Sequence, residues 1–138
     1  MYTLVEKQFN NSLLTDYTES DTDITLDTSS VFTTADAYEL KEILTRRECK
    51  VIYLTLRVES LHSSKFSVIV DGLIDNTSVQ HLDLRYCLQL GLEGAYHLRD
   101  LIKLNKTIKT INLADCEFTI AEIDIINTYV HSELTILI

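Results

Sequence analysis

An internal repeat of 28 to 29 residues constrains the fold of this chain more than any other feature. The segment Val51–Leu56 recurs as Val79–Leu84 and again as Ile108–Leu113, with starts 28 and 29 residues apart. A unit of this length is one supersecondary element that cannot bury its apolar side alone. Neighbouring units must therefore stack to build a continuous core.

The match continues outside these segments. Asn76–Val79 parallels Asn105–Ile108, and Cys87 and Cys116 each follow the final leucine of their segment by three residues. Chance does not account for all of these coincidences. We infer that the repeat extends through the second half of the chain.

Each unit is predicted to contain a short strand and a returning helix. Apolar residues alternate along the segments, so one side of each strand turns inward. The predicted inward residues are Leu54, Leu56, Leu82, Leu84, Ile111 and Leu113. After the second segment, apolar residues at helical spacing face these strands: Ala95, Leu98, Leu101 and Ile102.

The best-formed unit carries a recognisable motif. It runs Leu82-Asp-Leu84-Arg-Tyr-Cys87, then Leu92-Glu-Gly94-Ala95, Leu98, Leu101 and Asn105. This stretch resembles the leucine-rich repeat of ribonuclease inhibitor and NOD-like receptors, with its pattern L-x-L-x-x-(N/C)-x-L and a Gly-Ala helix start. The resemblance is nearly complete in residues 79–107, good in 108–136 and looser in 51–78. There Glu59 holds the Asn/Cys position and no glycine matches Gly94.

The resemblance implies an α/β fold, a right-handed leucine-rich-repeat solenoid shaped as a short horseshoe. Its parallel strands would line the concave face and its helices the convex face. It also implies a non-catalytic protein–protein interaction module, an intracellular adaptor or inhibitor. In this family the Asn/Cys side chain satisfies backbone groups of the loop, so Glu59 predicts a distorted first full turn.

The two ends of the repeat array are less regular. We expect residues 1–30 to form an acidic N-terminal cap, with a helix over 4–15 and a degenerate strand at Ile24–Leu26. Residues 31–138 then carry the repeats, starting with a helix from Thr34 that Thr33 or Thr34 caps. The last repeat is incomplete. We align its Leu137 with Ile111, at a spacing of 26 residues.

Composition and charge limit the cellular compartments and the classes of partner that we expect for this chain. The chain has 138 residues, 46% hydrophobic, and a net charge of -9, of which residues 1–30 contribute -5 (six acids, one lysine). We therefore do not expect it to bind nucleic acid or anionic membranes. We see no signal peptide and no apolar run near the roughly 18 residues of a membrane span. Three distant cysteines suggest free thiols, so we expect a cytoplasmic protein, with secretion as an effector left open.

Catalytic, cofactor and metal sites are not expected. Cys87 and Cys116 occupy a repeat position and are read as structural rather than nucleophilic. The four histidines are scattered, with no nucleophile and orienting group beside them. The segment from Glu19 to Ser30 starts like a calcium loop but lacks its glycine and its closing glutamate.

Outward strand positions instead align in columns, and aromatic and arginine residues among them are typical of binding hot spots. The columns are Tyr53, His81 and Thr110; Thr55, Asp83 and Asn112; Arg57, Arg85 and Ala114; and Val58, Tyr86 and Asp115. The predicted partner-binding residues are Tyr53, Arg57, His81, Asp83, Arg85, Tyr86, Asn112 and Asp115.

Other functions stay open. The chain can instead be a structural subunit of a large assembly, such as an axonemal or cytoskeletal complex. In that case it docks, or associates with itself, through its apolar C-terminal strand: Leu134, Ile136, Leu137 and Ile138. A pathogen effector that mimics host repeat proteins, or a fragment of a longer repeat protein, is a further reading.

Overall fold

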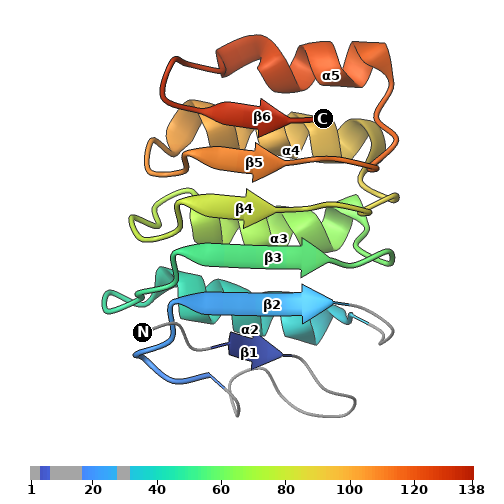
Figure 1. Ribbon diagram of the computed structural model, residues 1–138. Helices are drawn as coiled ribbons and strands as arrows, with labels where there is room; N and C mark the ends of the chain where they lie inside the picture. Colours follow the sequence, from blue (N-terminus) through green and yellow to red (C-terminus); the bar gives the residue numbers. More distant parts are fainter. Residues whose placement is uncertain (1–3, 7–16, 28–31) are drawn as a thin grey trace.

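The computed structural model describes residues 4–6, 17–27 and 32–138. These residues form an α/β structure with one six-stranded parallel sheet (Figure 1). In chain order the elements are β1 (Leu4–Glu6), β2 (Asp23–Asp27), α2 (Thr34–Thr45), β3 (Tyr53–Arg57), α3 (Ser63–Leu73), β4 (His81–Asp83), α4 (Gly91–Leu104), β5 (Thr110–Asn112), α5 (Ile120–Ile126), the 3-10 helix η1 (Asn127–Tyr129) and β6 (Thr135–Leu137).

The strands lie side by side in chain order, and each neighbouring pair is parallel. Their register follows the repeat: Leu54 pairs with Leu82, and Leu82 pairs with Ile111. The predicted strand around Ile24 is confirmed as β2, with Ile24 opposite Leu54. Equivalent residues of successive units therefore stand next to one another across the sheet.

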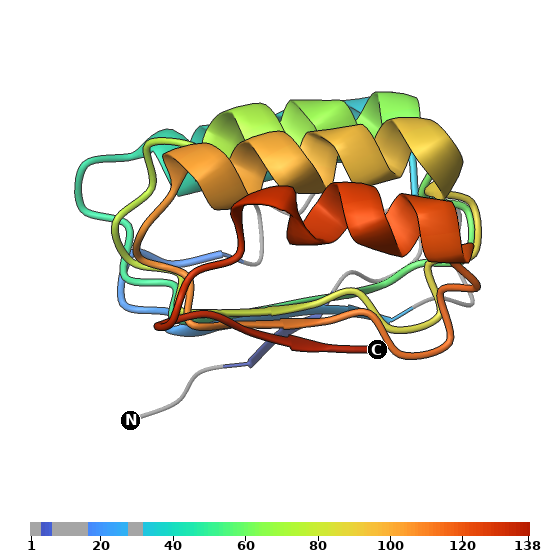
Figure 2. The same cartoon turned by 90° about the horizontal axis from the view of Figure 1, so that it is seen from above.

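The helices cover one side of this sheet. Figure 2 shows α2, α3, α4 and α5 together on the same side of the strands. Along β3 the buried residues Leu54 and Leu56 alternate with half-buried ones, so the leucines face the helices. The core is the layer between strands and helices, and no described helix lies on the opposite side, which we call the open sheet face.

Helix α2 begins where the sequence predicts. Thr33 is its N-cap: the amide of Asp36 donates to Thr33 Oγ1 at 3.1 Å, and the amide of Thr33 donates to Asp36 Oδ2 at 2.9 Å. This reciprocal pair satisfies two amides that have no partner within the helix. Thr119 and Glu122 form the same arrangement at the start of α5.

Helix α4 begins at Gly91, three residues before the predicted Gly-Ala start. Its inward residues are those predicted, since Ala95, Leu98, Leu101 and Ile102 are all buried. A Cβ on Gly94 would lie 2.6 Å from the Cβ of Leu90, so a side chain does not fit there. Close packing of the incoming loop explains this glycine.

Two buried asparagines connect successive units behind the sheet. Asn105 Nδ2 donates to the carbonyl oxygens of Leu73 at 2.7 Å and Asn76 at 3.0 Å. One unit earlier, Asn76 Nδ2 donates to the carbonyl of Leu44 at 2.9 Å. Each Oδ1 accepts backbone amides of its own turn. These bonds satisfy carbonyls at the ends of α2 and α3 that lack helical partners.

Glu59 does not hold the interior Asn/Cys position, because its side chain is exposed, but its turn differs from the later ones, as the sequence predicts. The buried residue of this turn is Leu61, whose amide donates to the carbonyl of Val58 at 3.1 Å. The same bond joins Cys87 to Leu84 in the next unit, at 3.2 Å. Leu84 is equivalent to Leu56, so the turn after β3 starts two residues later, at Val58, than the turn after β4. Val58 is also buried.

Both ends of the chain differ from the prediction. Leu4–Glu6 form a strand, so the helix expected over 4–15 is wrong at its start, and its residues 7–15 lie outside the described residues. At the other end Ile136, not Leu137, pairs with Ile111. Helix α5 has only seven residues and is followed by η1, so this unit returns to the sheet one residue earlier than predicted.

Candidate interaction surface

The open sheet face carries most of the predicted partner-binding residues. Because side chains alternate along a strand, residues that flank the buried leucines point away from the helices. The register confirms two predicted columns: Tyr53 with His81 and Thr110, and Thr55 with Asp83 and Asn112. Each column crosses three adjacent strands.

A ring pair forms the centre of the first column. The Tyr53 and His81 rings are stacked, with centroids 4.8 Å apart and planes 14° from parallel. On its other side, His81 Nδ1 lies 2.7 Å from Thr110 Oγ1. His81 is therefore held between its two neighbours.

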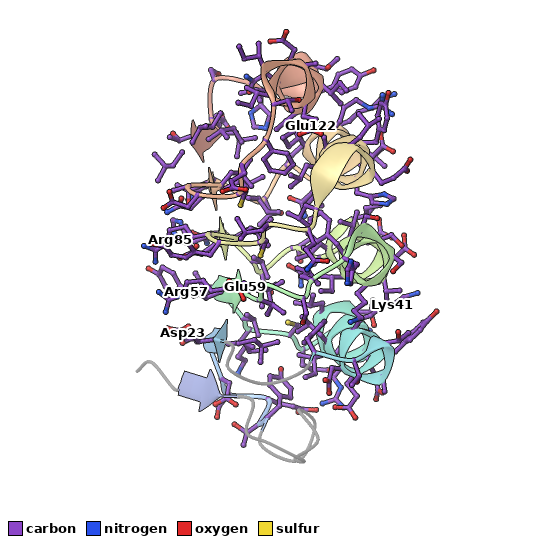
Figure 3. The ribbon with its side chains drawn as sticks, turned by 90° about the vertical axis from the view of Figure 1, so that its right-hand side faces the viewer. Asp23, Lys41, Arg57, Glu59, Arg85 and Glu122 are labelled. Atoms are coloured by element: carbon purple, nitrogen blue, oxygen red, sulfur yellow. The ribbon has the colours of Figure 1, made fainter. Side chains whose placement is uncertain are left out.

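The next exposed feature is an ion pair within one strand end. Arg85 Nη2 lies 2.9 Å from Asp83 Oδ2, and Arg85 Nε lies 3.1 Å from each carboxylate oxygen. These hydrogen bonds raise the pKa of Arg85 further above its ordinary value. Figure 3 shows Arg57 and Arg85 as neighbours on the side away from the helices. Two guanidinium groups thus stand together on this face.

The fourth predicted column is only partly correct. Val58 is buried and does not belong to the surface. Tyr86 and Asp115 are exposed, and both have left-handed backbones, with φ of 65° and 59°. Such a backbone costs an ordinary residue about 1–2 kcal/mol, whereas aspartate tolerates it better. Strain of this kind is typical of binding sites.

The sequence reasoning missed Asp23, which pairs with Tyr53 and extends the first column onto β2. Burial raises the pKa of its carboxyl group, while a hydrogen bond from Thr25 acts in the opposite direction. Alternation around Ile24 was the available signal, because it places Asp23 and Thr25 on the outward side of β2. Asn112 faces outward as predicted, but its Oδ1 accepts the amide of Ala114 at 3.1 Å.

The thiols of the repeat lie inside the fold. Cys87 Sγ donates to the carbonyl of Leu56 at 2.8 Å, and Cys116 Sγ donates to the carbonyl of Leu84 at 2.9 Å. Burial raises the pKa of Cys87 to about 12 and that of Cys116 to about 11. Both groups are neutral thiols at pH 7, and a thiol in this state is a poor nucleophile and metal ligand.

The remaining candidates do not come together. His97 lies in α4, and His62 and His131 lie in connections. Asp21 accepts the amide of Thr18 at 2.7 Å within a turn. Within the described part of the chain, no three His, Cys, Asp or Glu side chains are placed to hold a metal ion.

At the other predicted surface, the C-terminal strand, Leu137 and Ile138 are exposed and Ile136 is half-buried. Leu134 is buried, so its assignment to an edge interface is wrong. It packs into the core because the turn after η1 directs it inward, ahead of β6. In the described sheet β6 pairs with β5 alone and is an edge strand.

The sequence also gave no hint of a pocket of about 340 Å³ at the ends of α2 and α3. Arg46, Arg47, Cys49, Asn76 and Ser78 are among its lining residues. Ser78 Oγ donates to Cys49 Sγ at 3.4 Å, and Asn76 contributes to the turn described above. The polar groups of this pocket are therefore partly engaged in holding the turn between α3 and β4.

A comparison with protein-family models gives no match, and a comparison with curated proteins gives none either. No helix among the described residues is both long and apolar enough to cross a bilayer.

Proposed function

We propose that this chain is a short, right-handed leucine-rich-repeat solenoid of the ribonuclease-inhibitor type that acts as a non-catalytic protein-binding module. Support for the architecture comes from residues that repeat with the units. Asn76 and Asn105 make equivalent bonds to the preceding helix, and Cys87 and Cys116 make equivalent bonds to the preceding strand. These four side chains thus join one unit to the last, as stacking repeats require.

The observation that carries the binding function is the ordered row on the open sheet face. His81 contacts Tyr53 on one neighbouring strand and Thr110 on the other, and Arg85 is held beside them by Asp83. Aromatic and arginine side chains dominate the energy of protein interfaces. Their fixed orientation reduces the entropy that binding costs. The partner in this proposal is a cytoplasmic protein, because all three cysteines are free thiols.

The test compares two matched Tyr/Arg pairs on opposite sides of the molecule. Tyr53→Ala/Arg57→Ala removes a pair on β3 at the open sheet face. Tyr96→Ala/Arg99→Ala removes a pair on α4, where the Arg99 guanidinium lies 4.9 Å from the Tyr96 ring centroid. We expect affinity capture from the source cell to recover the same partner with wild type and with the α4 variant, but not with the Tyr53/Arg57 variant. Equal recovery by both folded variants argues against this face.

A second candidate is a structural subunit that docks through β6. The observation in its favour is that the edge strand exposes Leu137 by 49% and Ile138 by 62%. An unpaired apolar edge is a template for pairing with another chain. If this edge is the interface, Leu137→Lys converts an assembly to a monomer in analytical ultracentrifugation. A chain that is monomeric without the substitution contradicts self-association.

A further inference from the structure

A second exposed surface lies where β4 and β5 lead into α4 and α5. Tyr86 and Leu88 lie in the turn after β4, Leu92 is the second residue of α4, and Ile120 is the first residue of α5. Their exposed fractions are 49%, 41%, 47% and 81%. The parallel strands β4 and β5 end at the same edge of the sheet, where α4 and α5 begin, and α4 packs against α5, so both helix starts lie at one edge. We call these four residues the edge patch.

The conformation of the turn keeps this patch in solvent. Tyr86 has a left-handed backbone, and its amide donates to the carbonyl of Ala114 at 3.2 Å in the next unit. The turn is therefore held by the next unit, although tyrosine is strained there. Leu90, in the same loop, is buried and anchors it to the core. Leu88 and Leu92 flank this anchor and remain outside.

The surroundings of the edge patch are acidic. Residues 83–93 and 115–122 contain five acids and one arginine, a net charge of -4, and that arginine is already bonded to Asp83. Glu93 and Glu117 are exposed beside the apolar residues. Figure 3, which looks onto this edge, shows Glu59 and Glu122 there as well. On the same side of the fold the Lys65 amine donates to the carbonyl of Phe32 at 2.6 Å.

We infer that the edge patch docks a basic segment of a partner protein, with apolar side chains on Tyr86, Leu88, Leu92 and Ile120 and lysine or arginine on the acidic rim. Opposite charges across an interface favour this occupant. A second copy of this chain brings the same acidic rim, and an anionic membrane is repelled likewise. Four side chains are also fewer than the 20–30 residues a side of a standard globular interface, so a segment fits better.

The inference rests on the proposed function only in taking the partner to be a protein. It is tested without that partner, using a short synthetic peptide that has leucines on one helical side and lysines on the other. We expect the peptide to shift amide NMR signals of residues 86–93 and 117–122 in the ¹⁵N-labelled full chain. We also expect its dissociation constant to rise with salt, because exposed charges are screened.

Leu88→Ser/Leu92→Ser is expected to weaken this binding about tenfold, from the loss of buried apolar area. Leu104→Ser is the matched control, since Leu104 lies at the other end of α4 and is 55% exposed. Glu117→Lys tests the charge and is expected to weaken binding of the lysine peptide. A folded state common to all variants is verified from their NMR spectra.

Three outcomes of the peptide experiment overturn the inference. The first is that Leu104→Ser loses as much affinity for the peptide as Leu88→Ser/Leu92→Ser does. The second is that a peptide with glutamate in place of lysine binds as tightly as the lysine peptide. The third is that the NMR shifts spread over the whole acidic surface. Self-association of the chain that Leu88→Ser/Leu92→Ser abolishes also overturns it, in favour of a second copy. The double variant leaves Tyr53 and Arg57 of the open sheet face unchanged. Failure at the edge patch is therefore distinguishable from failure of the open sheet face.

Discussion

The thiol of Cys87 donates a hydrogen bond to the carbonyl oxygen of Leu56, 2.8 Å away on the preceding strand. Cys116 repeats this contact with Leu84 one unit later. A cysteine in this position joins adjacent units and fills the interior of the turn. The contact predicts that both thiols act on stability rather than on chemistry.

Cys87→Ala is expected to lower the free energy of unfolding by about 1–3 kcal/mol, because the carbonyl of Leu56 loses its donor and a small cavity opens. Cys49→Ala is the control. Cys49 is only half-buried, and its sulfur accepts long bonds from Ser78 and Asn76, so the expected loss is below about 1 kcal/mol. Urea unfolding followed by circular dichroism measures both. Equal losses would contradict a special role for the Cys87 bond.

Stability is expected to fall as the pH rises above 9. Burial raises the pKa of Cys87 to about 12 and of Cys116 to about 11, from an ordinary value of 9.0. Between pH 9 and 11 the unfolded thiols lose protons while the folded ones retain them, so high pH favours unfolding. The loss approaches about 1.4 kcal/mol per pH unit for each thiol. Below pH 9 the stability that the two protonated thiols contribute is fully present.

Denaturant midpoints measured from pH 8 to pH 11 check this dependence. A variant with alanine at both Cys87 and Cys116 is expected to be less stable at pH 8 but to have a shallower slope. Tyr17 contributes in the same direction above pH 10, since burial raises its pKa to about 12. An unchanged slope in the double variant would rule out the thiols as the cause.

Asn105→Ala is expected to cost about 3 kcal/mol or more. Its side chain makes four hydrogen bonds to backbone groups, and each buried group left without a partner costs about 1–3 kcal/mol. Asn112→Ala is the control, because Asn112 is half-buried and accepts one amide, so its expected cost is about 1 kcal/mol or less. Thermal unfolding that ranks these two variants in the reverse order is the contrary result.

Gly94→Ala is expected to destabilise the chain, although alanine is favoured over glycine in a helix by about 1 kcal/mol. The added Cβ meets the Leu90 Cβ at 2.6 Å, and such overpacking costs about 1–3 kcal/mol. Thermal unfolding measures whether Gly94→Ala lowers or raises the stability. A melting temperature above that of the wild type would mean that the loop around Leu90 yields without cost.

Much of the core was predictable from alternation and spacing. Leu54, Leu82 and Ile111 pair as the repeat indicates, because the parity of a residue in a strand determines which side it faces. The first two columns of the open sheet face follow from the same rule. Thr33 as a helix cap was also predictable, because a threonine ahead of an acidic first turn has a local physical reason.

Turn lengths and chain ends were not predictable in this way. Val58 is buried and Leu61 ends its turn, since β3 runs longer than β4, and no local pattern separates these alternatives. The register of β6 depends on where a short α5 and η1 return the chain. A shift of one residue in the register of a strand moves each of its side chains to the opposite face of the sheet.

The repeat by itself determined the order of strands and helices and the residues of the core, because side-chain direction is a local property of strands and helices. Only the tertiary structure decided which carbonyl oxygens Asn76, Cys87, Asn105 and Cys116 bond to, since those partners lie one unit away. It also brought the start of α4 next to the start of α5. The apolar and acidic residues of the edge patch come from two units, and stacking alone places them on one surface.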